Sequence, residues 1–236
     1  MITPRQALPR DWTRFLTGGP IGIGGDIGTT EKGTSNPSCI TITERARGLY
    51  LQRLVLRFKT SNEEVWFALL QCIFDDLRER EGKARRLCLD ASSEVFFAQA
   101  VKKKFIVFCP IDLVKGGETI QKGAEKFSYK VLLGNLYSSA FEDALVACPD
   151  EKWFRDDHRR VRREKGTFVT DTGDNGEHGD TFDSGKLSYW ALEHGTGRAE
   201  AHGVPIGGFG SPASAGRHVK NPFAHLFDAV RSAVNA

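Results

Sequence analysis

The chain has 236 residues, 40% of them hydrophobic and 27% charged, with a net charge of +3 at pH 7. This length suits one generous domain with appendages, and the composition allows a substantial core. The small net charge excludes a strongly basic or acidic chain, so the local distribution of charge carries more information. No run approaches the ~20 apolar residues of a membrane span, and the N-terminus lacks a signal-peptide pattern. We therefore expect a soluble intracellular protein without a membrane partner.

The first half of the chain predicts an antiparallel meander followed by a helix. Three β-rich runs, separated by short turns, cover 21–28, 38–45 and 49–59. The period then changes over 60–80, where apolar residues fall at helical spacing behind a cap at Ser61 or Asn62. This run predicts a helix.

The second half predicts alternating strands and helices. We expect strands over 84–93, 105–114 and 167–172, and helices over 93–104, 150–166 and 183–195, with a mixed, largely helical stretch at 118–147. In the last helix Asp183 lies near the N-cap and Gly195 at the C-cap. Five scattered cysteines without a Cys-x-x-Cys pair predict free thiols of a reducing compartment, most of them buried.

Composition divides the chain into three parts. Residues 1–20 have no clear period and read as a lead-in or the remnant of an interdomain linker, and 21–195 hold the predicted sheet and helices. Residues 196–236 form a Gly/Ala/Pro-rich tail that ends in a short amphipathic helix. The order of elements predicts an α/β, ribonuclease-H-like fold: a mixed sheet, antiparallel meander first and parallel strands later, with helices on both faces.

Acids stand at the ends of these predicted elements. Asp26 closes the first strand, Asp90 closes the strand after the long helix, and Asp180 and Asp183 flank the start of the last helix. If the two strands are neighbours, their carboxylates converge and repel one another, which cations relieve. Oxygen ligands without Cys or paired His favour Mg²⁺ or Mn²⁺, and two such ions hydrolyse phosphodiesters. The competing interpretation is that each Asp is a turn former or helix cap.

Three segments carry a resemblance to a known family. "GGDIGTT" (24–30), "CLDASS" (88–93) and above all "EHGDTFDSGKLSYWAL" (177–192) resemble the nuclease domain of the large terminase subunit of tailed bacteriophages, particularly of Mu-like phages. The stretch from "VACPDEKW" through a basic run to "TFVTDTG" (146–173) is similar as well. The resemblance implies a ribonuclease-H-like fold and a metal-dependent endonuclease that cuts duplex DNA with two Mg²⁺ or Mn²⁺ ions during genome packaging.

The resemblance also implies site residues and partners. Asp26 matches the first metal-binding acid, Asp90 the second, and either Asp183 or Asp180 the third, with the helix alignment favouring Asp183. His178 matches a group near the metals or one that handles protons. The family's full-length proteins carry an N-terminal packaging ATPase and work with a small subunit and a portal in the host cytoplasm. No G-x-x-x-x-G-K-[ST] motif exists here, so we expect the isolated nuclease half.

Two basic runs are candidates for a DNA surface. We expect phosphate contacts, with little base specificity, from Arg155, Arg159, Arg160, Arg162, Arg163, Lys165, Lys102, Lys103 and Lys104. The competing interpretation is a solvated helix face, which the interleaved Asp156, Asp157 and Glu164 support.

Other functions start from the same residues. "GGDIGTT" also resembles the first phosphate loop of the actin, heat-shock chaperone and sugar-kinase class, in which Gly28, Thr29 and Thr30 would contact ATP phosphates. That class needs two duplicated domains and a second phosphate loop, for which "DTGDNG" and "PIGGFGS" are poor candidates. A non-catalytic DNA- or capsid-binding domain on the same fold is a further alternative, and a ribonuclease-H-like resolvase or transposase would share the chemistry.

Overall fold

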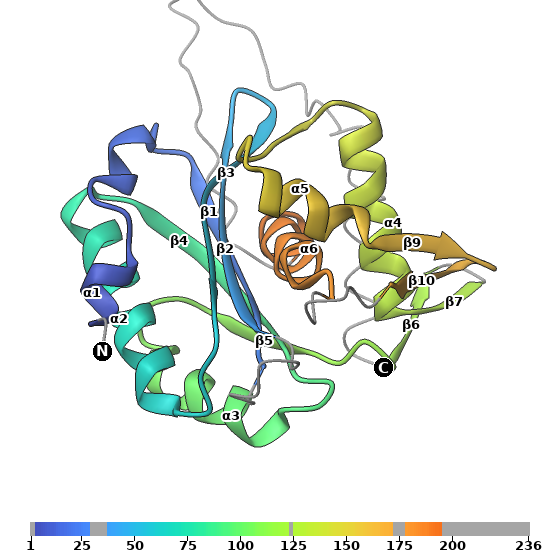
Figure 1. The fold of residues 1–236 in the computed structure, drawn as a ribbon, viewed down its shortest axis with the longest axis horizontal. Helices are drawn as coiled ribbons and strands as arrows, with labels where there is room; N and C mark the ends of the chain where they lie inside the picture. The colour runs from blue at the N-terminus through green and yellow to red at the C-terminus, as the bar shows by residue number, and fades with distance from the viewer. Residues whose placement is uncertain (1–2, 29–36, 123–124, 172–177, 195–236) are drawn as a thin grey trace, which may run out of the picture. The chain divides into compact units, whose positions relative to one another are not determined.

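The computed structural model describes residues 3–28, 37–122, 125–171 and 178–194 (Figure 1). The chain divides into two compact units, 1–197 and 198–236. The predicted tail at 196–236 and the predicted cap Gly195 lie outside the described residues. In the part of the chain that the structure describes, no helix is long and apolar enough to cross a membrane.

The described elements of the first unit are helices and strands in mixed order. The helices are α1 (Pro4–Ala7), the 3₁₀ turn η1 (Trp12–Phe15), α2 (Glu63–Glu79), α3 (Val95–Phe105), α4 (Tyr129–Glu142), α5 (Lys152–Arg159) and α6 (Asp180–Glu193). The strands are β1 (Pro20–Asp26), β2 (Ser38–Ala46), β3 (Leu49–Phe58), β4 (Lys83–Asp90), β5 (Ile111–Val114), β6 (Thr119–Lys122), β7 (Glu125–Ser128), β8 (Val146–Ala147), β9 (Val161–Glu164) and β10 (Thr167–Thr170).

The main sheet is mixed and confirms the predicted fold class. It has six strands in the order β5-β4-β1-β2-β3-β8. β1, β2 and β3 form the predicted antiparallel meander. β4 joins β1 in parallel, and β5 joins β4 in parallel. Helices lie on both sides of this sheet, with α2 and α3 on one side and α6 on the other (Figure 1). This is the ribonuclease-H-like arrangement.

One face of the sheet is a conventional apolar layer. Side chains alternate between the two faces of a strand, and Ile21 and Ile23 of β1 point to the same side as Ile40 and Ile42 of β2. These four residues pack in one cluster with the apolar faces of α2 and α3. The predicted helix over 60–80 is confirmed, and the Asn62 side chain accepts a hydrogen bond from the backbone N–H of Glu64 at 2.9 Å.

The other face of the sheet is built for close contact with α6. A Cβ atom at Gly22 would overlap the backbone of Ser188, and one at Gly24 would overlap the backbone of Ser184 and Ser188. Thr41 and Thr43 of β2 hydrogen-bond through their hydroxyls to Ser184 at 2.8 Å and to Ser188 at 2.6 Å. The glycines of "GIGIGGD" therefore let a helix backbone approach the strand. This packing fixes α6 across β1, β2 and β4.

Three predicted elements differ from the structure. The strand expected over 105–114 is present only at Ile111–Val114, because Phe105 ends α3 and a turn follows. The mixed stretch at 118–147 begins with the β6–β7 hairpin before α4. The helix expected over 150–166 ends at Arg159, and the remaining basic residues form β9, which pairs with β10 in a hairpin. Gly166 has φ +80, which provides the tight turn between these strands.

Residues 4–15 pack on the sheet domain. Leu8 and Trp12 are buried in the same cluster as α2, and the Trp12 indole donates a hydrogen bond to the Asp76 carboxylate at 2.8 Å. Arg5 forms an ion pair with the same carboxylate. This segment, predicted to be a lead-in, therefore contributes to the folded unit of residues 1–197. Whether it also joins this domain to another stays a prediction.

Candidate active site

Asp26 and Asp90 end two neighbouring parallel strands. In the β1–β4 pairing Gly25 stands opposite Leu89, so the next residue on each strand is an aspartate. The two carboxylates therefore lie at the same edge of the sheet, as the sequence predicted for neighbouring strands. The Asp90 side chain also accepts a hydrogen bond from the backbone N–H of Ser92 at 2.8 Å, so Asp90 shapes the turn as well. Both residues keep some exposed surface.

The first turn of α6 brings two more acids to this edge. α6 begins at Asp180, so Asp180 and Asp183 both lie in its first turn, on one side of the helix. Asp180 is only 2% exposed, whereas the Asp183 side chain is 30% exposed. The predicted N-cap role of Asp183 is wrong, because the cap is Gly179 in the left-handed conformation. We refer to Asp26, Asp90, Asp180 and Asp183 as the acid site.

A residue from another helix holds the start of α6. Gly179 has no side chain with which to cap the helix. Instead Asp157 of α5, which is fully buried, accepts hydrogen bonds from the backbone N–H of Gly179 at 3.1 Å and of Thr181 at 2.8 Å. It also accepts one from the Thr181 hydroxyl at 2.5 Å. A carboxylate at a helix N-terminus accepts hydrogen bonds from the free N–H groups and is attracted to the positive end of the helix dipole. Asp157 is therefore not part of a solvated face, which had been the competing interpretation.

His158 extends this hydrogen-bonded chain into an aromatic layer. Because the Thr181 hydroxyl donates to Asp157, it accepts from His158 Nδ1 at 2.8 Å. Burial lowers the pKa of His158 to about 4, so the ring is neutral. Its Nε2 faces the hydroxyl of Tyr137 at 3.4 Å, and the ring centroid lies 4.1 Å from that of Phe154. This neutral imidazole fixes α5 against α6.

The carboxylates of the acid site act on one another. Burial raises the pKa of Asp26 well above its usual range, and the charges of Asp183, Asp90 and Asp180 raise it further, in that order. Burial, followed by the charges of Asp157 and Asp183, raises the pKa of Asp180 to about 7. Asp183 therefore influences Asp26 more strongly than Asp180 does.

The cation beside these acids comes from α6 itself. Lys186, only 8% exposed, forms an ion pair with Asp183 one turn before it. Arg57 of β3 is a second cation that acts on Asp180. Within the described ranges, no three Asp, Glu, His or Cys side chains are gathered tightly enough to hold a metal ion. The ammonium of Lys186 is the positive charge in contact with Asp183.

The chemistry of the acid site nevertheless fits a hard divalent cation. Every donor in it is a carboxylate oxygen, which Mg²⁺ and Mn²⁺ prefer. One oxygen of the buried Asp180, Oδ2, accepts no hydrogen bond from any described residue. A buried carboxylate oxygen without a partner is costly, and a cation would satisfy it. Asp180 is therefore one residue that would hold such an ion, together with Asp26, Asp90 and Asp183 of the acid site.

His178 and the basic residues occupy different positions around this site. His178 is partly buried immediately before the cap Gly179, and no hydrogen bond or ion pair joins it to an acid among the described residues. Arg155 and Arg159 are exposed on α5, where Arg155 pairs with Asp150. Arg160, at the end of α5, is partly buried.

The rest of the basic residues divide between the hairpin and α3. Arg162, Arg163 and Lys165 are exposed on the β9–β10 hairpin, which projects from the body of the domain (Figure 1). Arg162 is paired with Asp171. Lys102, Lys103 and Lys104 end α3, on the other face of the sheet from α6. Lys104 lies 4.1 Å from the ring centroid of Phe67 and is thereby bound to α2.

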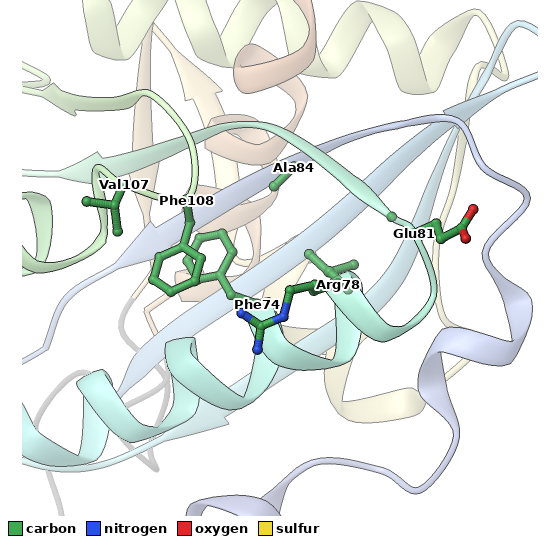
Figure 2. A pocket seen from close by; sticks show the side chains of 8 residues that line it. Phe74, Arg78, Glu81, Ala84, Val107 and Phe108 are labelled. Atoms are coloured by element: carbon green, nitrogen blue, oxygen red, sulfur yellow. The ribbon is translucent and has the colours of Figure 1, made fainter.

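An apolar concavity lies away from the acid site. Phe74, Leu77, Ala84 and Phe108 line it, with Arg78 and Glu81 at its rim (Figure 2). Ala84 stands near the start of β4, six residues before Asp90, which corresponds to about 20 Å along a strand. The concavity therefore has no part in the chemistry of the carboxylates.

Comparisons with known proteins agree with this architecture. No family model and no curated protein sequence matches the chain. The fold is shared with the large terminase from a thermophilic bacteriophage, with a TM-score of 0.51 and 13% identity over 80% of this chain and 41% of that one. The ADP complex of the same terminase gives a TM-score of 0.52 at 14% identity, again over 80% of this chain and 42% of the other. The chain thus spans about two-fifths of the length of that terminase.

The resemblance to large terminases that the motifs indicated is confirmed by this phage terminase at the level of the fold. The human cytomegalovirus terminase nuclease domain also aligns, with a TM-score of 0.48 and 12% identity over 80% of this chain and 88% of that one. None of these matched structures tests the narrower resemblance to Mu-like phages.

The structure adds three residues that the sequence analysis missed. Asp157 stands three positions after the buried Phe154, so both lie on the inner side of α5, and that spacing was a usable signal. Lys186 follows Asp183 at the same spacing. His158 had no local signal, because its partners Thr181 and Tyr137 are distant in sequence.

Proposed function

We propose that this chain is a metal-dependent endonuclease acting on duplex DNA, the nuclease part of a phage terminase large subunit. The observation that carries the proposal is that Asp26 and Asp90 end adjacent parallel strands, and that Asp183 stands in the first turn of the helix packed across those strands. The fold shared with a large terminase supports it. In longer proteins of this kind we expect a packaging ATPase domain on the same chain, with the small subunit and the portal as partners.

The proposed chemistry is phosphodiester hydrolysis in which Asp26, Asp90 and Asp183 hold two Mg²⁺ or Mn²⁺ ions. Such ions activate a water and stabilise the leaving oxygen of a phosphodiester. Asp183 is our choice for the third ligand because its charge acts on Asp26 more strongly than that of Asp180. Asp157 keeps the first turn of α6 in place, so that Asp183 faces the two strand ends.

We further propose that α5 and the hairpin bind DNA phosphates. α5 packs on α6 through Asp157 and presents Arg155 and Arg159 on its exposed side. Arg163 and Lys165 of the adjacent hairpin are exposed as well. Positive side chains beside a site of four carboxylates offset the repulsion between those acids and a phosphate backbone. Contacts of this kind position a duplex without reading its sequence.

Plasmid cleavage tests the proposal. With Mn²⁺ or Mg²⁺ the protein should nick or linearise supercoiled plasmid, and Asp90→Ala should abolish cleavage by removing a metal ligand. The matched control is Asp75→Ala, which removes an aspartate that pairs with Arg78 on α2, outside the acid site. This variant should cleave like the wild type. Plasmid that stays intact across metals and pH, with ATP hydrolysed instead, would favour the actin- and kinase-like alternative.

A further inference from the structure

Lys186 is the buried cation of the acid site. Its side chain is 9% exposed, and its ammonium is in contact with an Asp183 oxygen. The ammonium also lies 5.8 Å from the ring centroid of Phe182. A buried ammonium is costly unless a negative group pairs with it. The position of Lys186 therefore depends on the acids around it.

The dependence runs in both directions. Asp183 provides the negative partner that the buried ammonium requires, and the ammonium provides a positive charge beside the carboxylates of the acid site. Asp183 stands in the first turn of α6, which packs across β1 and β4, the strands that end in Asp26 and Asp90. Lys186 therefore offsets part of the repulsion among these acids when no other cation is bound.

A divalent ion held by Asp183 competes with this lysine. The ammonium occupies one oxygen of Asp183, and a second cation at the same carboxylate would stand within a few ångströms of it. Like charges at that range, in a partly buried site, repel strongly. Metal binding through Asp183 therefore requires the ion pair between Lys186 and Asp183 to loosen or break.

We propose that Lys186 is a built-in counter-cation, which stabilises the acid site when it is free of metal and competes with the metal for Asp183. This inference rests on the proposed function for the identity of the metal ligands. Lys186 then lowers the affinity of the acid site for a divalent metal ion. The acid site can then fold before a metal is bound, and metal binding exchanges one cation for another.

Removing the charge of Lys186 tests the exchange. Lys186→Met keeps an unbranched side chain of similar length and deletes the ammonium. In EDTA its melting temperature should fall by roughly 5 °C, because buried carboxylates lose their counter-cation. Its affinity for Mn²⁺, measured by calorimetry without DNA, should rise about tenfold. Added Mn²⁺ should remove most of the difference in melting temperature.

A matched variant controls for the loss of any buried cation. Arg86 of β4 is 9% exposed and forms an ion pair with Asp112. Arg86→Met should lower the melting temperature equally in EDTA and in Mn²⁺, and should leave Mn²⁺ affinity unchanged. Lys186→Gln repeats the charge removal with a polar side chain, in case Met does not fold. If neither Lys186 variant folds even with Mn²⁺, the proposal is wrong.

Failure of this inference is distinguishable from failure of the proposed function. Unchanged Mn²⁺ affinity in Lys186→Met, together with metal-dependent plasmid cleavage by the wild type, would overturn the competition and leave the nuclease standing. Tighter Mn²⁺ binding without any cleavage by the wild type would support the competition and overturn the nuclease. If calorimetry detects no Mn²⁺ binding by the wild type or by either Lys186 variant, the competition is refuted.

Discussion

The helices α2 and α6 pack on opposite faces of the same sheet by different means. α2 buries large apolar side chains such as Trp66, Leu70 and Ile73, and its own Asn62 caps it. α6 instead lies on Gly22 and Gly24 through small residues, and a residue of α5 holds its start. The apolar contacts of α2 tolerate adjustment, whereas the backbone contact of α6 does not. The acids that need precise placement stand on α6.

Gly24→Ala should strongly destabilise the protein, because it disrupts the close contact between β1 and α6. The new Cβ would overlap backbone atoms of Ser184 and Ser188, which cannot move aside without shifting the helix. We expect a loss of roughly 3 kcal/mol in the free energy of unfolding. Urea denaturation measures it. The control is Gly117→Ala, where a Cβ meets nothing within 4 Å, and the change should stay within about 0.5 kcal/mol. Equal stability of the two variants would refute the close packing.

Removing the cap of each helix should destabilise the protein to different extents, because α6 depends on Asp157 and α2 on Asn62. Asp157→Ala leaves three donors at the start of α6 without their acceptor, and should cost about 2–4 kcal/mol of stability. Asn62→Ala removes one cap bond from α2 and should cost about 1 kcal/mol. Only Asp157→Ala should also weaken Mn²⁺ binding, because it releases the turn that carries Asp183. Weaker metal binding in both variants, or in neither, would contradict this division.

α2 could be predicted from the sequence more fully than α6, because α2 depends on local residues and α6 on residues distant in the chain. The helical spacing of the apolar residues of α2 and its cap both lie within 60–80, so the bounds of this helix can be predicted from local residues. The fold class followed too, since Asp26 and Asp90 end recognisable strands. The contact between α6 and the sheet did not follow, because no residue near Gly22 and Gly24 indicates it, and "GGDIGTT", which begins at Gly24, also resembles a phosphate loop. The purpose of these two glycines is set by Ser184 and Ser188, some 160 residues away in the printed sequence. The spacing of Asp157 from Phe154 indicates that Asp157 is buried, but its role as a cap could not be predicted because Gly179 and Thr181 lie 22 and 24 residues away.

DNA binding should distinguish the two faces of the sheet. On the α6 side, changing the exposed Arg159, Arg163 and Lys165 together to Ala should weaken duplex binding and lower the salt slope, log Kd against log salt, by up to about 3. The same change at Lys102, Lys103 and Lys104 on the α2 side should lower it less, because Lys104 is bound to α2. Anisotropy titrations over several salt concentrations measure both slopes. An equal reduction in the two variants would extend the DNA surface to α3.

A further expected effect concerns pH and the buried Asp180. Its pKa of about 7 lies above its ordinary value of 3.8, so the folded state binds more protons than the unfolded state between these values. Without metal, stability should therefore fall as pH rises from about 4 to 7. Asp180→Asn removes this contribution, so the variant should melt above the wild type at pH 8 and close to it at pH 5, in EDTA. Parallel melting curves across that range would mean that Asp180 is not buried as an acid.

The central claim is that α6 brings Asp183 to the ends of β1 and β4 so that the three acids share metal ions. A crystal soaked in Mn²⁺ tests it most directly, through the anomalous scattering of manganese. The account predicts manganese peaks within coordination distance of Asp26, Asp90 and Asp183, with the Lys186 ammonium moved away from Asp183. Manganese bound elsewhere, or the three carboxylates still apart with Lys186 in place, would contradict it.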